Sequence, residues 1–254
     1  MGRVIAVANQ KGGVGKTTTA VNLSACLAEA GQKTLIIDSD PQGNTTQGLG
    51  VDKTSLQHTT YDVFLQNRKI YDIIGEDVYP DLDLLPANID LAGAEIELIQ
   101  VPDNSYILKK AIAEVKDQYD FILIDCPPSL SLLTINALTA ADTVLVPLQC
   151  EFYALEGLSQ LMYTIRLIQN KLNPELSIEG IVFTMYDART NLSLEVVEEV
   201  KNELKDTNIY QTIIPRNVRL SEAPSYGQPI AVYDPNSKGA VAYRELAREV
   251  IARR

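Results

Sequence analysis

The sequence predicts an α/β fold in which a doubly wound, mostly parallel sheet carries helices on both faces. Short runs rich in Val, Ile and Leu recur along the chain without the alternation of a half-exposed strand, which indicates strands covered on both faces. Segments of helical length lie between these runs, and strand–helix–strand repetition builds a parallel sheet. No linker or internal repeat interrupts this pattern, so we expect a single domain over residues 1–254.

The elements follow from these runs in chain order. Predicted strands lie at residues 3–8, 34–38, 82–86, 121–125, 143–148, 178–184 and 210–214. Helices are expected at residues 16–30, 130–141, 155–172, 192–204 and 240–252. Gly31 follows the first of these helices, at a position where glycine commonly ends a helix. Segment 49–81 is the least regular part of the chain, and we expect small helices there that cover one side of the sheet.

The composition limits the possible partners and compartments. The three cysteines, Cys26, Cys126 and Cys150, form no Cys-x-x-Cys pair, which disfavours a disulfide framework or a zinc ribbon and fits a cytoplasmic setting. The net charge of −11 disfavours nucleic-acid binding through bulk charge, so any contact with DNA requires a local basic patch. No apolar stretch reaches the length of a membrane-spanning helix.

The strongest functional signal follows the first predicted strand. It is the run Lys11-Gly12-Gly13-Val14-Gly15-Lys16-Thr17-Thr18. Glycines let a backbone wrap around phosphates with its N–H groups pointing inward, and the helix that follows directs the positive end of its dipole at the same anion. Lys16 would contact the β- and γ-phosphates, and Thr17 would offer its hydroxyl to Mg²⁺. The run departs from the standard pattern at Gln10, which stands where the first glycine is expected.

Carboxylates end two further predicted strands. Asp38 and Asp40 have an i, i+2 spacing that points both side chains the same way in an extended segment. This edge of a parallel sheet faces the ligand crevice, where one or both could position a water or assist the metal. Asp125 ends an apolar strand in the form of a Walker B segment, whose aspartate holds Mg²⁺, usually through water. Cys126 follows it and is expected to be a small buried residue.

Together these motifs resemble the ParA/Soj branch of the ParA/MinD family, whose deviant Walker A loop carries a second lysine at its entrance, as Lys11 does here. Further stretches with the same resemblance lie at residues 91–98, 126–130, 133–138, 151–158 and 215–224. The similarity spans nearly the whole chain, and segment 49–81 is its vaguest part. It implies a P-loop NTPase-like fold and a Mg²⁺-dependent ATPase that acts in chromosome or plasmid partition.

The resemblance implies a role for each motif residue. Residues 12–18 would cradle the phosphates of ATP, with Lys16 and Thr17 as described above. Lys11 would reach the nucleotide held by the partner subunit, so that Lys11 and Gly12 would lie at the interface of an ATP-sandwich homodimer. Asp40 would place the attacking water, Asp125 would support the metal, and Asp38 would lie near both.

The resemblance also implies a base pocket and a DNA surface. Pro215 and Asn217 would line the adenine. Arginines that match Arg189 and Arg219 belong to a DNA-facing surface in Soj-like relatives, and Arg216 is a further candidate. No helix-turn-helix motif is recognisable in the sequence. Binding to double-stranded DNA should therefore be directed at the DNA phosphate backbone and not at the base sequence. The family further implies a ParB/Spo0J-type centromere-binding partner and a nucleoid-associated location.

Two other functions share this fold and stay open at this point. A MinD-like membrane-cycling regulator of cell division requires a membrane-binding amphipathic helix. Segment 240–252 has an apolar stripe, but its small residues and its glutamates favour packing on the core, so we expect no stable membrane anchor. An iron–sulfur reductase of the nitrogenase iron protein type requires two cysteine thiolates per subunit at the dimer axis, and Cys126 and Cys150 lack the flanking glycines.

Overall fold

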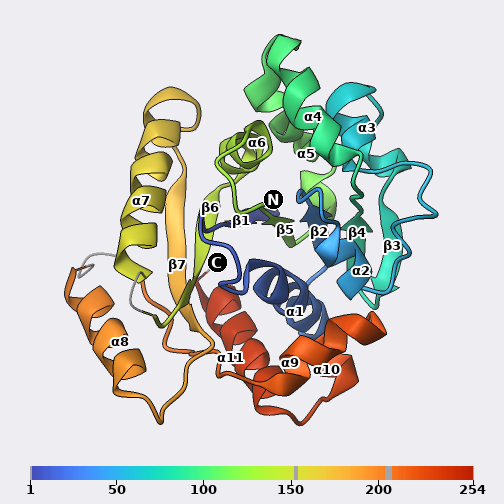
Figure 1. The fold of residues 1–254 in the computed structure, drawn as a ribbon. Coiled ribbons are helices and arrows are strands. Elements are labelled where there is room, and N and C mark those ends of the chain that lie inside the picture. Colours follow the sequence, from blue (N-terminus) through green and yellow to red (C-terminus); the bar gives the residue numbers. More distant parts are fainter. Residues whose placement is uncertain (1, 152–153, 204–207, 254) are drawn as a thin grey trace.

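The computed structural model describes residues 2–151, 154–203 and 208–253, and it confirms the doubly wound class (Figure 1). Within these residues one sheet has the strand order β3-β4-β2-β5-β1-β6-β7. Its strands are β1 (Arg3–Val7), β2 (Thr34–Asp38), β3 (Gly75–Tyr79), β4 (Leu82–Leu85), β5 (Phe121–Asp125), β6 (Thr143–Gln149) and β7 (Ser177–Thr184). Every neighbouring pair is parallel except β3 and β4, which are antiparallel at one edge.

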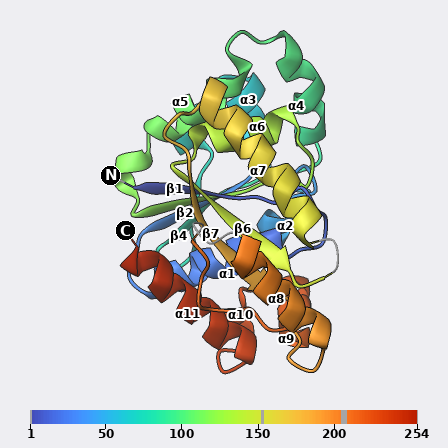
Figure 2. The ribbon, with the colours of Figure 1, turned by 90° about the vertical axis from the view of Figure 1, so that its left-hand side faces the viewer.

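Helices cover both faces of the sheet (Figures 1 and 2). One apolar core packs under α3 (Thr60–Leu65), α4 (Leu91–Glu97), α5 (Ile107–Ala113), α6 (Leu132–Ala140), α7 (Ala154–Lys171) and α8 (Asn191–Glu203). The other packs under α1 (Lys16–Glu29), α9 (Val218–Glu222), α10 (Ile230–Tyr233) and α11 (Lys238–Ala252). The short α2 (Asn44–Gly48) follows β2 at the carboxyl edge of the sheet. Continuous apolar strands are therefore buried on both sides, as the sequence predicted.

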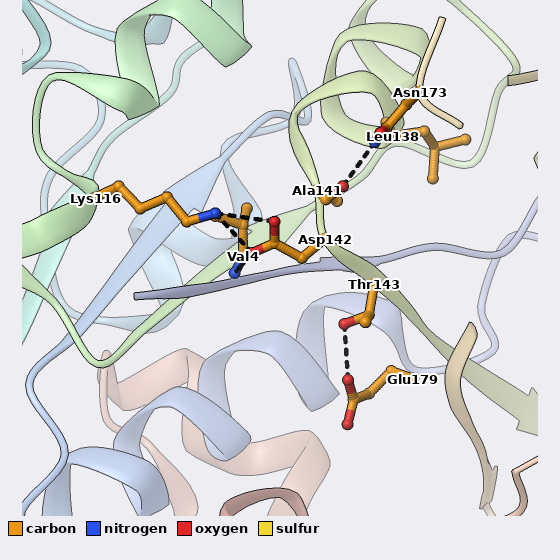
Figure 3. A network of polar contacts seen from close by, with 8 residues as sticks. All are labelled: Val4, Lys116, Leu138, Ala141, Asp142, Thr143, Asn173 and Glu179. Atoms are coloured by element: carbon orange, nitrogen blue, oxygen red, sulfur yellow. Dashed lines mark hydrogen bonds and ion pairs between the residues drawn. The ribbon is translucent and has the colours of Figure 1, made fainter. Parts of the chain in front are cut away.

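The amino ends of the central strands are closed by a network of polar side chains (Figure 3). Asp142, just before β6, accepts from Lys116 Nζ at 2.8 Å and from the Val4 amide of β1 at 2.8 Å. Thr143 donates to Glu179 of β7 at 2.7 Å. These contacts tie β1, β6 and β7 together at the edge opposite to the phosphate loop.

Two sequence expectations differ from the structure. Residues 210–214 form no regular strand, although Tyr210 and Ile214 each donate a backbone hydrogen bond to β7. The reason lies in α11, because Glu249 accepts the amides of Gln211 and Thr212 that a ladder would use. Segment 49–81 contains the expected small helix α3 but also the strand β3, whose polar, exposed sequence at the sheet edge gives no apolar run to recognise.

The remaining differences are small. Gly31 has the left-handed φ of +77° directly after α1, which confirms its role in ending that helix. Helices α4, α5, α9 and α10 are short additions between the expected elements. Phe152 and Tyr153, from the family-like stretch 151–158, and Leu204, the expected last residue of a helix, lie outside the described residues.

Candidate active site

The phosphate loop connects β1 to α1 and has the backbone shape that its glycines predict. Gly13 and Gly15 adopt left-handed φ values of +75° and +91°, which other residues rarely tolerate. The Lys16 ammonium folds back into the loop and donates to the Lys11 carbonyl at 2.9 Å. Burial lowers the pKa of Lys16, while the charges of Asp125 and Asp40 act in the opposite direction. Lys16 is therefore held where phosphate oxygens could accept from the same ammonium.

The two strand-end carboxylates lie side by side at the carboxyl edge of the sheet. Asp38 of β2 and Asp125 of β5 are register partners, and both are fully buried. Burial raises the pKa of Asp38 to about 6. Burial and the neighbouring Asp38 charge raise the pKa of Asp125 to about 7. Two buried carboxylates at this spacing favour a nearby cation, since only opposite charge offsets their desolvation.

The hydrogen bonds around these carboxylates fit a divalent cation at Asp125. Thr17 and Thr45 both donate to Asp125 Oδ2 at 2.8 Å, whereas Asp125 Oδ1 is buried without a hydrogen-bond partner among the described residues. Asp38 accepts from the amide and hydroxyl of Thr46 at 2.8 and 2.7 Å. A carboxylate oxygen beside a hydroxyl is the oxygen donor set that Mg²⁺ prefers, so Thr17 and Asp125 fit that metal.

Asp40 lies in the loop between β2 and α2, where it is 8% exposed. Its Oδ1 accepts from the Gln42 amide at 2.9 Å, which orients the carboxylate. The charge of Asp40 acts on Lys16 and on Asp125, so it lies within electrostatic reach of both. The structure thus brings Asp40 to the phosphate loop, and its role with water stays a prediction.

The loop entrance contains Lys11 and Gly12. The Lys11 ammonium forms an ion pair with Glu151, which follows β6. A Cβ atom on Gly12 would meet no heavy atom within 4 Å, and Gly12 has no positive φ. Space beside Gly12 is therefore open in a single subunit, and the expected subunit contact there stays a prediction.

A cavity of about 350 Å³ continues from the phosphate loop toward the last loops of the chain. Its lining includes Gly15 and Thr18 of the loop together with Met185, Pro215, Arg216, Asn217 and Leu220. Thr184, the last residue of β7, connects the phosphate loop to the last loops that line the cavity, because its hydroxyl donates to the Val14 carbonyl at 2.8 Å. Pro215 and Asn217 thus line a cavity of the size of small-molecule sites beside the phosphate loop, and their contact with the adenine stays a prediction.

The three arginines proposed for DNA binding lie on two adjoining loops. Tyr186 and Pro215 form an isolated parallel bridge, and the Arg216 amide donates to the Tyr186 carbonyl at 3.0 Å. The side chains of Arg189 and Arg219 are 87% and 55% exposed. We call these two loops, residues 185–190 and 215–222, the arginine surface.

Sequence reasoning missed Thr45, Thr46 and Glu151. Glu151 lies two residues after the end of β6, so the signal that found Asp38 and Asp125, an acid at the carboxyl end of a strand, was present there too. Thr45 and Thr46 carry no comparable signal, because their partners Asp125 and Asp38 are distant in sequence or separated by a turn.

Two structural observations concern the other functions that share the fold. The apolar stripe of α11, including Tyr243, Leu246 and Val250, is buried in the core with α1, as the sequence predicted. In the described part of the chain no helix is both long and apolar enough to cross a membrane. Cys126 and Cys150 are buried in the core, and burial raises the pKa of both thiols.

The parallel sheet, the glycine loop with two lysines and the strand-end carboxylates define a deviant Walker A nucleotide triphosphatase. A family model described as an AAA domain matches residues 2–178. The chain is 58% identical over 252 residues to the sporulation initiation inhibitor protein Soj of Bacillus subtilis, with 99% of both chains covered. It is 53% identical over 253 residues to the chromosome partitioning protein ParA of Caulobacter vibrioides, with 99% and 94% covered. The chain belongs to the ParA/Soj family of partition ATPases.

A solved structure agrees with this assignment. The structure of cobyrinic acid a,c-diamide synthase from Mycobacterium smegmatis with bound ADP and magnesium has a TM-score of 0.86 at 41% identity, covering 99% of this chain and 94% of that one. The cell division ATPase MinD of Pyrococcus furiosus has a TM-score of 0.83 at 30% identity, with full coverage of both chains. The fold is therefore shared among proteins with different names.

Proposed function

We propose that this protein closes as an ATP-sandwich homodimer, binds double-stranded DNA without sequence preference and acts with a ParB/Spo0J-type centromere-binding partner in chromosome or plasmid segregation. ATP hydrolysis, with ATP and Mg²⁺ as cofactors, follows from membership of the partition ATPase family. The finer statements rest on the geometry of the phosphate loop and of the arginine surface.

The chemistry of hydrolysis is positioning and charge stabilisation. Lys16 and the loop amides bind the β- and γ-phosphates, and Mg²⁺ bound near Thr17 and Asp125 neutralises developing negative charge. A water also needs an acceptor near the γ-phosphate. Asp38 has its oxygens occupied by Thr46 and the Asp40 amide, whereas Asp40 uses only Oδ1 for the Gln42 amide. Asp40 is therefore the best acceptor for the attacking water.

The homodimer is supported by the loop entrance. In the single subunit the Lys11 ammonium is paired with Glu151, at the entrance of the loop, and the family resemblance gives this lysine its role across the subunit interface. The open space beside Gly12 allows two loops to approach closely. Lys11 would then add its charge to the nucleotide of the partner subunit.

The observation that carries DNA binding is the continuity between the nucleotide cavity and the arginine surface. Met185 and Asn217 line the cavity, and they lie four and two residues from Arg189 and Arg219. Nucleotide contacts can thus act on the loops that hold these arginines. A cytoplasmic, nucleoid-associated location would follow, and the ParB/Spo0J-type partner would release the dimer by stimulating hydrolysis.

Binding to random-sequence double-stranded DNA, measured with ATP, with ADP and without nucleotide across a salt series, tests this proposal. We expect tight binding with ATP only, and a steep decrease with salt because phosphate contacts dominate non-specific affinity. Arg189→Ala or Arg219→Ala should weaken binding and lower the log–log salt slope by about 1 for each lost contact.

Arg68→Ala is the matched control, because Arg68 is exposed and its amide donates to the carbonyl of Asp62 in α3. Figure 1 shows α3 away from α8 and α9. Equal binding by all three variants would remove the arginine surface from the proposal. No DNA binding with ATP at low salt would contradict the function itself, and co-sedimentation with anionic vesicles would then test the membrane alternative.

A further inference from the structure

The guanidinium of Arg189 is paired with a carboxylate of its own loop. Its Nη2 and Nε contact Asp187 Oδ2 and Oδ1 at 2.7 and 2.9 Å, so the pair is bidentate. The Arg189 amide donates to the same Asp187 Oδ1 at 3.0 Å, which fixes the turn that holds both side chains. These Arg189 hydrogen bonds hold the pKa of Asp187 well below its usual range.

Arg219 is occupied in the same way. Its Nη1 contacts Glu222 Oε2 at 2.8 Å, and its Nε lies 3.5 Å from Asp234 Oδ2. The Tyr233 hydroxyl donates to Glu222 Oε2 at 3.1 Å and fixes the carboxylate. Both outermost arginines of the surface therefore have a carboxylate on the guanidinium edge that a phosphate would use.

Carboxylates offset most of the positive charge of this surface. Arg189, Arg216 and Arg219 carry three positive charges, whereas Asp187 and Glu222 carry two negative charges. Asp234 lies outside the arginine surface and adds a third carboxylate 3.5 Å from Arg219. A phosphate that uses the Nε–Nη2 edge of Arg189 or the Nη1 atom of Arg219 must displace the carboxylate bound there.

We propose that Asp187 and Glu222 are built-in competitors of the DNA phosphates, which weaken DNA binding and make the bound dimer exchange readily. This inference rests on the proposed DNA binding by Arg189 and Arg219. An exposed ion pair is a weak interaction, so each carboxylate lowers affinity by about two- to fivefold and does not block binding. A homodimer contains four such pairs, and their effects multiply.

Competition between these carboxylates and the DNA phosphates also changes how steeply DNA affinity depends on salt concentration. DNA releases one condensed cation for each phosphate that the protein neutralises. A carboxylate that stays beside the arginine retains a cation at the interface, so fewer ions are released in total. Removing the carboxylate should therefore steepen the salt slope, whereas removing an arginine makes it shallower.

The test compares Asp187→Asn, Glu222→Gln and the double variant with the wild-type protein. Asparagine keeps the oxygen that accepts the Arg189 amide, and glutamine keeps an acceptor for the Tyr233 hydroxyl, so these local contacts can persist when the charge that pairs with the arginine is removed. Glu114→Gln is the control, because Glu114 has the same kind of exposed pair, with Lys69 at 2.7 Å, beside α5 on the other side of the molecule (Figure 1). Light scattering with ATP checks that every variant still dimerises.

We expect the double variant, which removes all four carboxylates of the dimer, to bind random-sequence DNA at least about fifteenfold more tightly with ATP and with a steeper salt slope. Glu114→Gln should stay within about twofold of the wild type. Unchanged affinity and slope in the double variant, or an equal gain in Glu114→Gln, would overturn the inference while leaving DNA binding intact. If the wild type itself fails to bind DNA with ATP, the proposed function fails and the inference falls with it.

Discussion

The phosphate loop and the arginine surface are both expected to bind phosphate, yet the protein builds them in opposite ways. At the loop, Asp38 and Asp125 are fully buried at strand ends and burial raises the pKa of both. At the surface, Asp187 is paired with an exposed arginine that lowers its pKa. The same side chain is therefore unstable as an anion in one place and stabilised as an anion in the other.

Because of this difference, the buried site is suited to retain a nucleotide, whereas the exposed surface is suited to exchange DNA phosphates. A buried carboxylate pair favours the arrival of a cation and its nucleotide, and encloses them in a rigid sheet edge. An exposed carboxylate next to an arginine favours the departure of a phosphate, because it replaces the lost contact at once. The predictions below test the enclosed site in turn, from the largest expected effect to the smallest.

Asp40→Ala should lower ATP hydrolysis at least about a hundredfold, since an acceptor for the attacking water contributes that order of rate. ATP and Mg²⁺ binding should persist, because Lys16 and the loop amides remain. Steady-state hydrolysis together with binding of a fluorescent ATP analogue checks both. Loss of ATP binding would instead give Asp40 a structural or metal-binding role, and hydrolysis at the wild-type rate would move the water to another residue.

Lys11→Ala and Gly12→Val should bind ATP and remain monomeric. The first removes the charge that crosses the interface, and the second adds a side chain that a single subunit accommodates, because nothing lies within 4 Å of its Cβ. Light scattering with ATP, and with ADP as the control, measures the mass. An ATP-dependent dimer in either variant would contradict the sandwich arrangement.

Asp125→Asn should stabilise the nucleotide-free protein by about 2 kcal/mol at pH 8. The raised pKa values mean that the folded state binds more protons than the unfolded state between about pH 4 and 7. The free energy of unfolding of the wild type therefore falls as pH rises through this window. That of Asp125→Asn should fall less. Thermal unfolding from pH 5 to 8 measures the difference, and a variant less stable than the wild type at pH 8 would contradict the argument.

Thr45→Val should have the smallest effect, because it removes one of two hydroxyls that donate to Asp125 Oδ2. The loss of one hydrogen bond of ordinary net strength, about 1 kcal/mol, should raise the Mg²⁺ concentration that half-saturates ATP binding by about fivefold to tenfold. Thr45→Ser keeps the hydroxyl and should restore the wild-type value. Equal behaviour of the two variants would show that Thr45 acts only through packing.

Local sequence pattern predicted the phosphate loop and the strand-end carboxylates, but not the residues that join them from other parts of the chain. Lys16, Thr17 and Asp125 follow apolar strands in a fixed order, so local pattern and fold class together place them. Thr45 joins the site through a contact that depends on how α2 approaches Asp125, which no local pattern encodes. Glu151 follows the end of β6, so the signal that found Asp125 could have found it too. The irregular course of residues 210–214 likewise depends on Glu249, which lies on a helix that packs only after folding.

Asn217 has a double use that limits how this chain can vary. It lines the nucleotide cavity, and its side-chain oxygen caps α9 by accepting from the Arg219 amide at 2.8 Å. Asp or Ser could replace the cap but would change the face that the cavity presents. In a library of all substitutions, position 217 should accept fewer residues than its neighbour Val218, which is 71% exposed and performs neither task.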